Sequence, residues 1–255
     1  MAKRWTEELK EAVDDIVARM DIIDGFGKAA GNVEGLAEME TDRFGISVVT
    51  TDGTVVNGGE AEADFPLQSI AKVFALTMAL EAIDEDVWKR IGREPSGDPF
   101  SSIIDLERFK GIPRNPFINA GALVVIDMLL SRKRGKGQAA NVREFLESRI
   151  GRARLGTEKQ IVSDDGDKAG FNNRSLAYMS KHFENLENDV EDVMKFYVEQ
   201  CAIKMNCKQL ALAGRYLIAG DKASVGERRL ARRLNAMMMS CGQYDGAGDF
   251  AYRVG

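Results

Sequence analysis

Two stretches of this chain are apolar nearly all the way round a helix, at residues 73–83 and 120–130. A helix without a polar face is typical of a protein interior, so both segments predict buried helices. The pattern is mostly helical from about Ser69 onward, apart from a loop-rich stretch at 92–118 that holds four of the five prolines. The sequence therefore predicts a helix-rich body around buried helices.

The first 66 residues have a different pattern. Apolar residues recur at helical spacing over 9–20, which predicts an amphipathic helix with Thr6 as its N-cap. The β-branched run at 44–51 and the short run at 54–56 predict a hairpin. Asp52 and Gly53 between them favour a type I′ turn. We also expect Asn141 and Asn188 to cap later helices, and residues 250–255 to begin a strand.

Composition narrows the possible partners. The 255 residues carry 35 Lys and Arg against 40 Asp and Glu, a net charge of −5, so no nucleic acid partner is expected. Apolar runs are too short for a membrane span, and the first residues do not resemble a secretory signal, so a cytoplasmic location is expected. Three cysteines and one histidine cannot supply a disulfide framework or a standard zinc site.

One motif carries nucleophilic chemistry. Ser69 and Lys72 stand three positions apart where the loop 64–68 enters the first buried helix, so they share one helix face. A lysine whose pKa is lowered by burial can take the serine proton. The helix N-terminus would favour a developing anion. Ser-x-x-Lys alone is a weak signal, with Ser as a cap and Lys on the surface, but Lys72 directly precedes the apolar run.

A second informative segment is Pro113–Ala122, which contains Asn-Pro-x-x-Asn before the second buried helix. Asn119 could be a simple helix cap. A side-chain amide at such a corner is also suited to hold a polar substrate.

Several blocks together resemble the serine-dependent glutaminases. The nucleophile block is 65–72 (Phe-Pro-Leu-Gln-Ser-Ile-Ala-Lys). Further matching blocks are 94–100, 113–122, 241–245 and 250–255, in the family's order across nearly the whole chain. The resemblance implies an α+β, serine β-lactamase/transpeptidase-like fold: an antiparallel sheet flanked by helices plus a helical lobe. It implies one catalytic domain over 1–255, with a sheet lobe at about 1–66 and 240–255 and a helical lobe at about 67–239.

The resemblance also implies the reaction: hydrolysis of L-glutamine to L-glutamate and ammonia through a glutamyl-serine intermediate, without metal or organic cofactor. Ser69 would be the nucleophile and Lys72 its base. Tyr197 and Tyr244 would relay the proton to ammonia and orient the site. Asn119 and Asn173 would hold the substrate's α-amino and carboxylate ends, and Gln68 would also line the pocket. Homo-oligomers are expected because the family commonly forms them.

Three departures from the family pattern stand out. Gly166 takes the place of a substrate-binding glutamate, although Asp165 and Asp167 flank it, and Asn32 takes the place of a tyrosine. The chain also stops before the family's last strands, one of which provides an oxyanion-hole N–H, so impaired activity is expected.

Two alternatives to a glutaminase remain at this stage. One is a penicillin-recognising serine hydrolase, which the Pro-Arg-Asn-Pro block disfavours. The other is a non-catalytic amino-acid-binding or oligomeric scaffold protein of the same fold.

Overall fold

The computed structural model describes residues 2–20, 28–29, 36, 39–134, 141–163 and 168–254. Its strands are β1 (Gly45–Val49), β2 (Val55–Gly59), β3 (Phe65–Pro66), β4 (Gly156–Thr157) and β5 (Ile203–Met205). Its α-helices are α1 (Ala2–Met20), α3 (Ala71–Ile83), α4 (Ile104–Arg108), α5 (Asn119–Arg134), α6 (Val142–Arg149), α7 (Lys159–Ser163), α8 (Lys168–His182), α9 (Val190–Cys201), α10 (Cys207–Gly214), α11 (Val225–Cys241) and α12 (Ala247–Val254). Short 3-10 helices are η1 (Gln68–Ile70), η2 (Asp84–Lys89), η4 (Arg215–Ile218) and η5 (Tyr244–Gly246).

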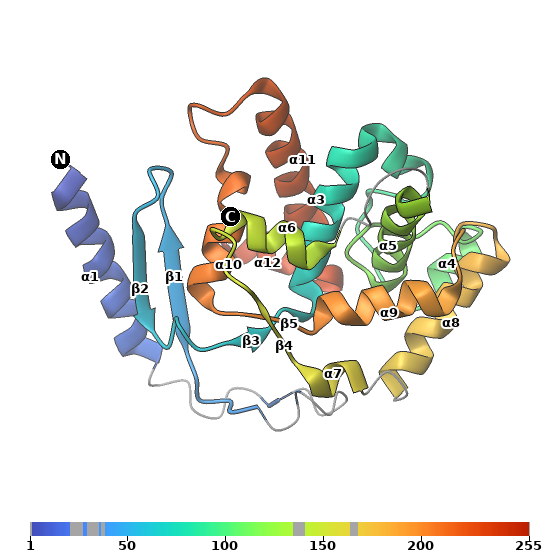
Figure 1. The fold of residues 1–255 in the computed structure, drawn as a ribbon, viewed down its shortest axis with the longest axis horizontal. Helices are drawn as coiled ribbons and strands as arrows, with labels where there is room; N and C mark the ends of the chain where they lie inside the picture. Colours follow the sequence, from blue (N-terminus) through green and yellow to red (C-terminus); the bar gives the residue numbers. More distant parts are fainter. Residues whose placement is uncertain are drawn as a thin grey trace.

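The described strands form two small antiparallel sheets instead of the one sheet expected from the sequence. One is the hairpin β1–β2, and the other has the order β3–β5–β4. Figure 1 shows the hairpin and α1 on one side, the second sheet crossing the middle, and the helices on the other side. The mixed α+β class is therefore confirmed.

Helix α1 packs on the hairpin through a close approach at Gly58. A Cβ at Gly58 would lie 2.5 Å from Val13 Cγ1, so a side chain there would push the helix away. Val13 is buried in this contact. The predicted helix is confirmed, but Thr6 is not its N-cap because the helix begins at Ala2.

The hairpin is confirmed and its predicted turn type is wrong. Val49 pairs with Val55, so the connection is longer than two residues, and only Gly53 of the two central residues has a positive φ (92°). A type I′ turn needs positive φ at both. Here the Thr54 amide donates to Asp52 Oδ1 (3.1 Å) and to Thr50 Oγ1 (3.1 Å), and these side-chain acceptors favour the longer loop.

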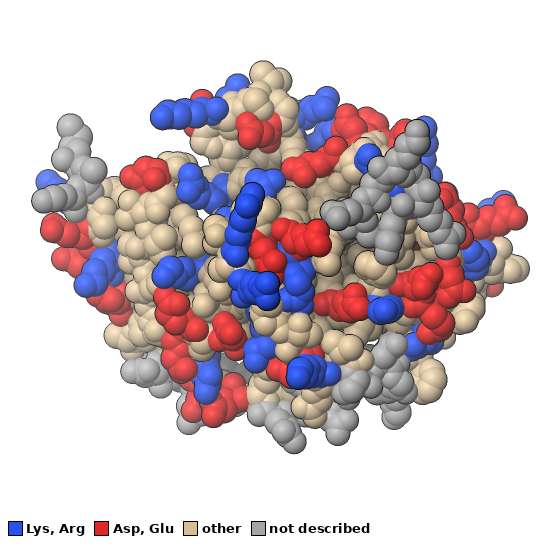
Figure 2. All heavy atoms as spheres, viewed as in Figure 1, with Lys and Arg blue, Asp and Glu red and all other residues tan. Residues whose placement is uncertain are grey.

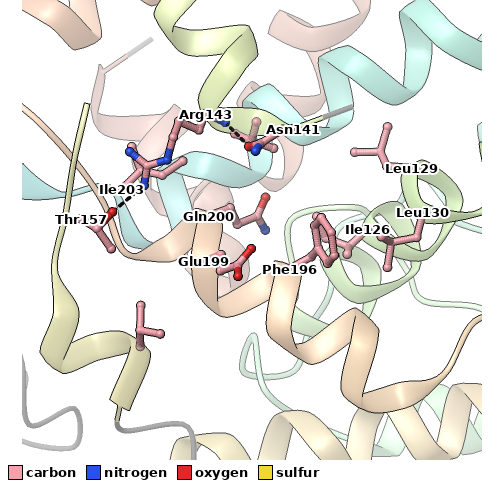
Figure 3. Close-up of a pocket in the computed structure, with 12 residues that line it drawn as sticks. Ile126, Leu129, Leu130, Asn141, Arg143, Thr157, Phe196, Glu199, Gln200 and Ile203 are labelled. Carbon is pink, nitrogen blue, oxygen red and sulfur yellow. Dashed lines mark hydrogen bonds between the residues drawn. The ribbon is translucent and has the colours of Figure 1, made fainter. Parts of the chain in front are cut away.

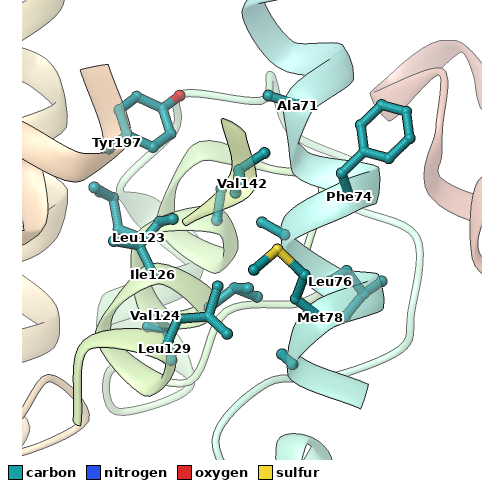
Figure 4. Packing of buried hydrophobic residues seen from close by; sticks show 14 of the residues in the cluster. Ala71, Phe74, Leu76, Met78, Leu123, Val124, Ile126, Leu129, Val142 and Tyr197 are labelled. Atoms are coloured by element: carbon teal, nitrogen blue, oxygen red, sulfur yellow. The ribbon is translucent and has the colours of Figure 1, made fainter. Parts of the chain in front are cut away.

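Both predicted buried helices, α3 and α5, lie side by side in the hydrophobic core. Figure 4 shows Met78 of α3 on the side toward Val124 of α5, whereas Tyr197 of α9 lies farther along the cluster, near Leu123. Each of these four side chains is buried. Burial on nearly every side explains why neither helix carries a polar face.

The structure corrects two predictions, one for a helix cap and one for a strand. The N-cap of α9 is Asp189, whose side chain accepts from the Glu191 amide, and not Asn188. Asn188 is instead held by Asp127 of α5, to which its side chain donates at 2.8 Å. The expected strand at the end of the chain is helix α12, in which Asp249 and Arg253 pair at i,i+4. A helix satisfies its backbone hydrogen bonds internally and needs no neighbouring strand. The predicted cap Asn141 of α6 is confirmed.

The charges of the surface are mixed. On the face seen in Figure 2, acidic and basic side chains lie next to one another over most elements. Among the described helices, none combines the length and the apolar character that crossing a bilayer requires.

Candidate active site

Ser69 lies at a sharp corner between the second sheet and helix α3. The Leu67 amide donates to Ile203 O (2.8 Å), which continues the pairing of β3 with β5 up to this corner. Gln68 then turns the chain with φ 48°, a conformation that residues other than glycine adopt rarely and that is frequent at functional sites. Ser69 follows in η1, partly exposed, and the buried helix begins two residues later.

Lys72 is a buried amine, with only 2% of its surface exposed. Its Nζ donates to Phe117 O (2.9 Å) and to Asn119 Oδ1 (2.7 Å). Burial lowers the pKa of Lys72 to about 8, opposed by a smaller interaction with the Cys201 thiol. At pH 7, about a tenth of these amines is therefore unprotonated.

Tyr244 joins the serine to the lysine. Lys72 Nζ lies 5.3 Å from the centre of the Tyr244 ring, within the range of a cation–π contact. Burial raises the pKa of the Tyr244 hydroxyl, whereas a hydrogen bond with the Ser69 side chain lowers it. The hydroxyl of Ser69 and the amine of Lys72 thus both contact this tyrosine. The ring of Phe100 packs against it at 5.0 Å between centroids.

The two predicted asparagines meet each other beside the lysine. Asn119, at the start of α5, donates from Nδ2 to Asn173 Oδ1 on α8 (2.9 Å), while its Oδ1 accepts from Lys72. Because the side chain of Asn119 makes these contacts, it does not cap α5. Asn115 instead holds the corner: its Oδ1 accepts from the amides of Phe117 (3.0 Å) and Ile118 (3.1 Å).

Tyr197 lies on the buried side of the same cluster. Its hydroxyl is hydrogen-bonded with Cys201, one turn further along α9. Burial raises the pKa of Tyr197 well above its usual value and that of the Cys201 thiol to about 11, so both groups are protonated at neutral pH. Cys201 interacts electrostatically with Lys72, and Tyr197 with Tyr244, so the α9 pair lies near the other groups.

A pocket of about 520 Å³ opens at Ser69 and is lined by Tyr244, Phe117 and side chains of α11 and α12. Gln68, directly before the serine, has a buried Nε2 with no hydrogen-bond partner among the described residues. Gln68 itself is not among the residues that line this pocket.

All seven residues singled out from the sequence lie around this one corner, and the structure adds three groups. These are the Phe117 carbonyl, the Asn115 side chain and Cys201. The i,i+4 spacing of Cys201 from Tyr197 indicates that the two side chains share a helix face. No pattern in the sequence indicates the direction of the Phe117 carbonyl. Residues 165–167 and Asn32, where departures from the family pattern were noted, lie outside the described residues. Within the described ranges, no group of three or more His, Cys, Asp or Glu side chains is arranged to hold a metal ion.

Comparisons with known proteins agree in sequence and in structure. The family model described as Glutaminase matches residues 27–255. Glutaminases of Rhodopseudomonas palustris strains BisB18 and HaA2 are 43% and 44% identical to the chain, over 97% of it and over 80% and 81% of their own lengths. The crystal structure of a probable glutaminase of Bacillus subtilis superposes with a TM-score of 0.81 at 29% identity, covering 97% of this chain and 78% of that one. A structure of probable glutaminase from that organism complexed with 6-diazo-5-oxo-L-norleucine superposes with a TM-score of 0.78 at 26% identity, covering 96% and 76%.

Proposed function

The chain belongs to the glutaminase family, and from this premise we propose that it hydrolyses L-glutamine to L-glutamate and ammonia at Ser69. The observation that carries the proposal is the buried Lys72, with a pKa of about 8, three residues after a partly exposed serine. Such an amine can act as a base near neutral pH, which an ordinary surface lysine cannot. The family match favours this reading over a penicillin-recognising hydrolase.

Lys72 is the base that activates the nucleophile. A neutral amine has two N–H groups and one lone pair. Both of its hydrogen bonds in the structure are donations, to Phe117 O and to Asn119 Oδ1. The lone pair is therefore left to accept the proton of Ser69, and the two acceptors hold the amine in place for this step.

The reaction then proceeds in two steps, acylation of Ser69 and hydrolysis of the resulting ester. Ser69 Oγ bonds to the side-chain amide carbon of glutamine while its proton moves to Lys72 Nζ. The C–N bond breaks with transfer of this proton to the departing nitrogen, which gives ammonia and a glutamyl ester on Ser69. Water attacks the ester, its proton returns to Ser69 as the C–O bond breaks, and glutamate leaves. Tyr244, hydrogen-bonded with Ser69 and protonated at neutral pH, relays the proton to the nitrogen. Tyr197 orients the site from its buried position.

Asparagine side chains recognise the ends of the substrate. Asn119 and Asn173 already share a hydrogen bond (2.9 Å) beside Lys72, and as amides they can accept from an ammonium and donate to a carboxylate. The unpartnered Nε2 of Gln68 adds a donor next to the nucleophile.

We extend the proposal to the fold, the cellular location and the oligomeric state of the protein. A Ser-x-x-Lys motif that leads from a 3-10 turn into a buried helix, beside an antiparallel sheet, supports a serine β-lactamase/transpeptidase-like fold with one catalytic domain. A cytoplasmic location is supported by Cys201, Cys207 and Cys241, which are all free thiols. A homo-oligomer is expected from the family, and light scattering on a sizing column measures it.

An ammonia-release assay on wild type and Ser69→Ala tests the proposal. Wild type should release ammonia from L-glutamine, and loss of the nucleophile should reduce turnover by about 10³-fold or more. Ser175→Ala, which removes an exposed hydroxyl on α8, is the matched control and should retain full activity.

Equal background release from wild type and Ser69→Ala would reject catalysis by this chain. Glutamine binding retained in calorimetry would then favour the alternative, a non-catalytic amino-acid-binding protein of the same fold.

A further inference from the structure

A second pocket lies away from Ser69, between helices α5, α6 and α9. Its volume is about 310 Å³, within the range of sites that hold small organic molecules. None of the residues that line it lines the pocket at Ser69. Part of its wall is apolar, formed by Ile126 and Leu129 of α5 and Phe196 of α9.

The feature that sets this pocket apart is the side chain of Gln200, which lines it. Gln200 is only 3% exposed, and neither its Nε2 nor its Oε1 has a hydrogen-bond partner among the described residues. Figure 3 shows its amide among the lining residues, directed toward the space between Asn141 and Phe196. A buried amide without any partner is rare, because both its donor and its acceptor lose their bonds to water.

The hydrogen-bonding groups of Gln200 define the complementary ligand. A donor and an acceptor lie side by side on one planar group, and a primary carboxamide presents the same pair in reverse. A carboxylate offers only acceptors and would leave Oε1 unpaired.

The charges around the pocket also favour an uncharged ligand. The charged residues that line the pocket are Arg143 and Glu199, one of each sign. The guanidinium of Arg143 already donates to Leu155 O (2.6 Å), Gly156 O (3.0 Å) and Thr157 Oγ1 (2.8 Å), which ties β4 to α6. A balanced lining of this kind favours a ligand without net charge.

We propose that this pocket is a second binding site, for a small uncharged molecule that carries a primary carboxamide on an apolar body. The carboxamide forms two hydrogen bonds with Gln200, and the apolar body packs on Phe196 and Leu129. The site is separate from the hydrolytic corner and does not depend on the reaction proposed there.

Calorimetric titration with benzamide and its charged isostere benzoate tests the site. Benzamide should bind wild type in the millimolar range and bind Gln200→Leu at least about tenfold more weakly, since both hydrogen bonds to the ligand are lost. Benzoate should bind wild type at least about tenfold more weakly than benzamide. Ser180→Ala is the matched control, because Ser180 Oγ is also buried and unpartnered but does not line the pocket. It should bind benzamide as wild type does.

Thermal unfolding of the same variants gives an independent readout. Because Gln200→Leu removes an unpartnered buried amide, its melting temperature should rise by about 2–4 °C. Gln200→Met, closer in shape, replaces it for both measurements if Gln200→Leu does not fold. No binding of benzamide, equal binding by the Gln200 variant, tighter binding of benzoate, or a lower melting temperature would each overturn the proposal.

Discussion

At the scale of single residues, the chemistry depends on the burial of Lys72. The sequence placed this lysine directly before an apolar run, and that context predicted its burial. Ser69 and Asn119 were found through their motifs, whereas Tyr244 was assigned only from the family resemblance. Sequence reasoning could not find the Phe117 carbonyl that holds Lys72, because the direction of a backbone carbonyl in a loop depends on tertiary contacts such as the donation of Asn115 Nδ2 to Glu94 O (3.0 Å).

The pH dependence of turnover should report the titration of Lys72. Because burial lowers its pKa to about 8 and the neutral amine is the base, kcat/KM should rise with pH through about 8 and then level off. Lys72→Arg, which stays charged, should be inactive at every pH. A wild-type profile that is flat between pH 6 and 9 would contradict this assignment.

The stability of the fold should also depend on pH through the lowered pKa of Lys72. The folded pKa of Lys72 lies below the unfolded value of 10.5, so the unfolded chain binds more protons between pH 8 and 10.5. Burial of the charged amine therefore destabilises the fold at pH 7, and Lys72→Met should unfold at higher urea than wild type. This advantage should fade as the pH rises from about 8 toward 10.5. A variant less stable than wild type at pH 7 would mark the lysine as structural.

At the scale of elements, periodic segments were predicted well and element ends were not. The buried helices α3 and α5 and the hairpin followed from their patterns. The caps at Thr6 and Asn188 were wrong because a capping residue is defined by local geometry, and Asn188 is bound instead by Asp127. The last segment, residues 250–255, was predicted from its own residues to begin a strand, whereas it lies in helix α12, which ends at Val254.

The start of α5 depends on the close approach of Gly121 to the preceding loop. A Cβ on Gly121 would lie 1.9 Å from Asn115 O, a backbone atom, so the corner that presents Phe117 and Asn119 to Lys72 would have to move. Gly121→Ala should lower kcat/KM by about 100-fold, since small displacements at such a site are costly. The ammonia assay measures this.

Gly97→Ala is the control for that substitution, because a Cβ there meets nothing within 4 Å. It should retain wild-type activity. Full activity in Gly121→Ala would show that the corner does not position the lysine.

At the scale of the whole molecule, a buried polar network joins segments that are far apart in sequence. Asp127 of α5 is fully buried, pairs with Arg90, and accepts from the amides of Glu187 (3.0 Å) and Asn188 (2.7 Å). Asn185 donates to Arg90 O (2.9 Å) and to Gly111 O (2.8 Å). This network could not be predicted from the sequence, because its members share no motif and meet only in the folded chain.

Asp127→Ala should destabilise the fold by about 3 kcal/mol, because it removes the buried carboxylate that pairs with Arg90 and accepts from the amides of Glu187 and Asn188. Urea unfolding at pH 7 measures the change. Glu8→Ala, which breaks an exposed pair with Arg4 at 2.9 Å, should change stability by less than about 0.5 kcal/mol. Equal effects of the two substitutions would show that the network contributes little to the fold.

The most direct test of the hydrolytic assignment is rapid quenching of the enzyme during turnover of L-glutamine, followed by peptide mapping with mass spectrometry. We predict a glutamyl ester on the peptide that contains Ser69, present in wild type and absent in Ser69→Ala. Steady glutamine turnover with an adduct on another residue, or undiminished turnover by Ser69→Ala, would contradict the account.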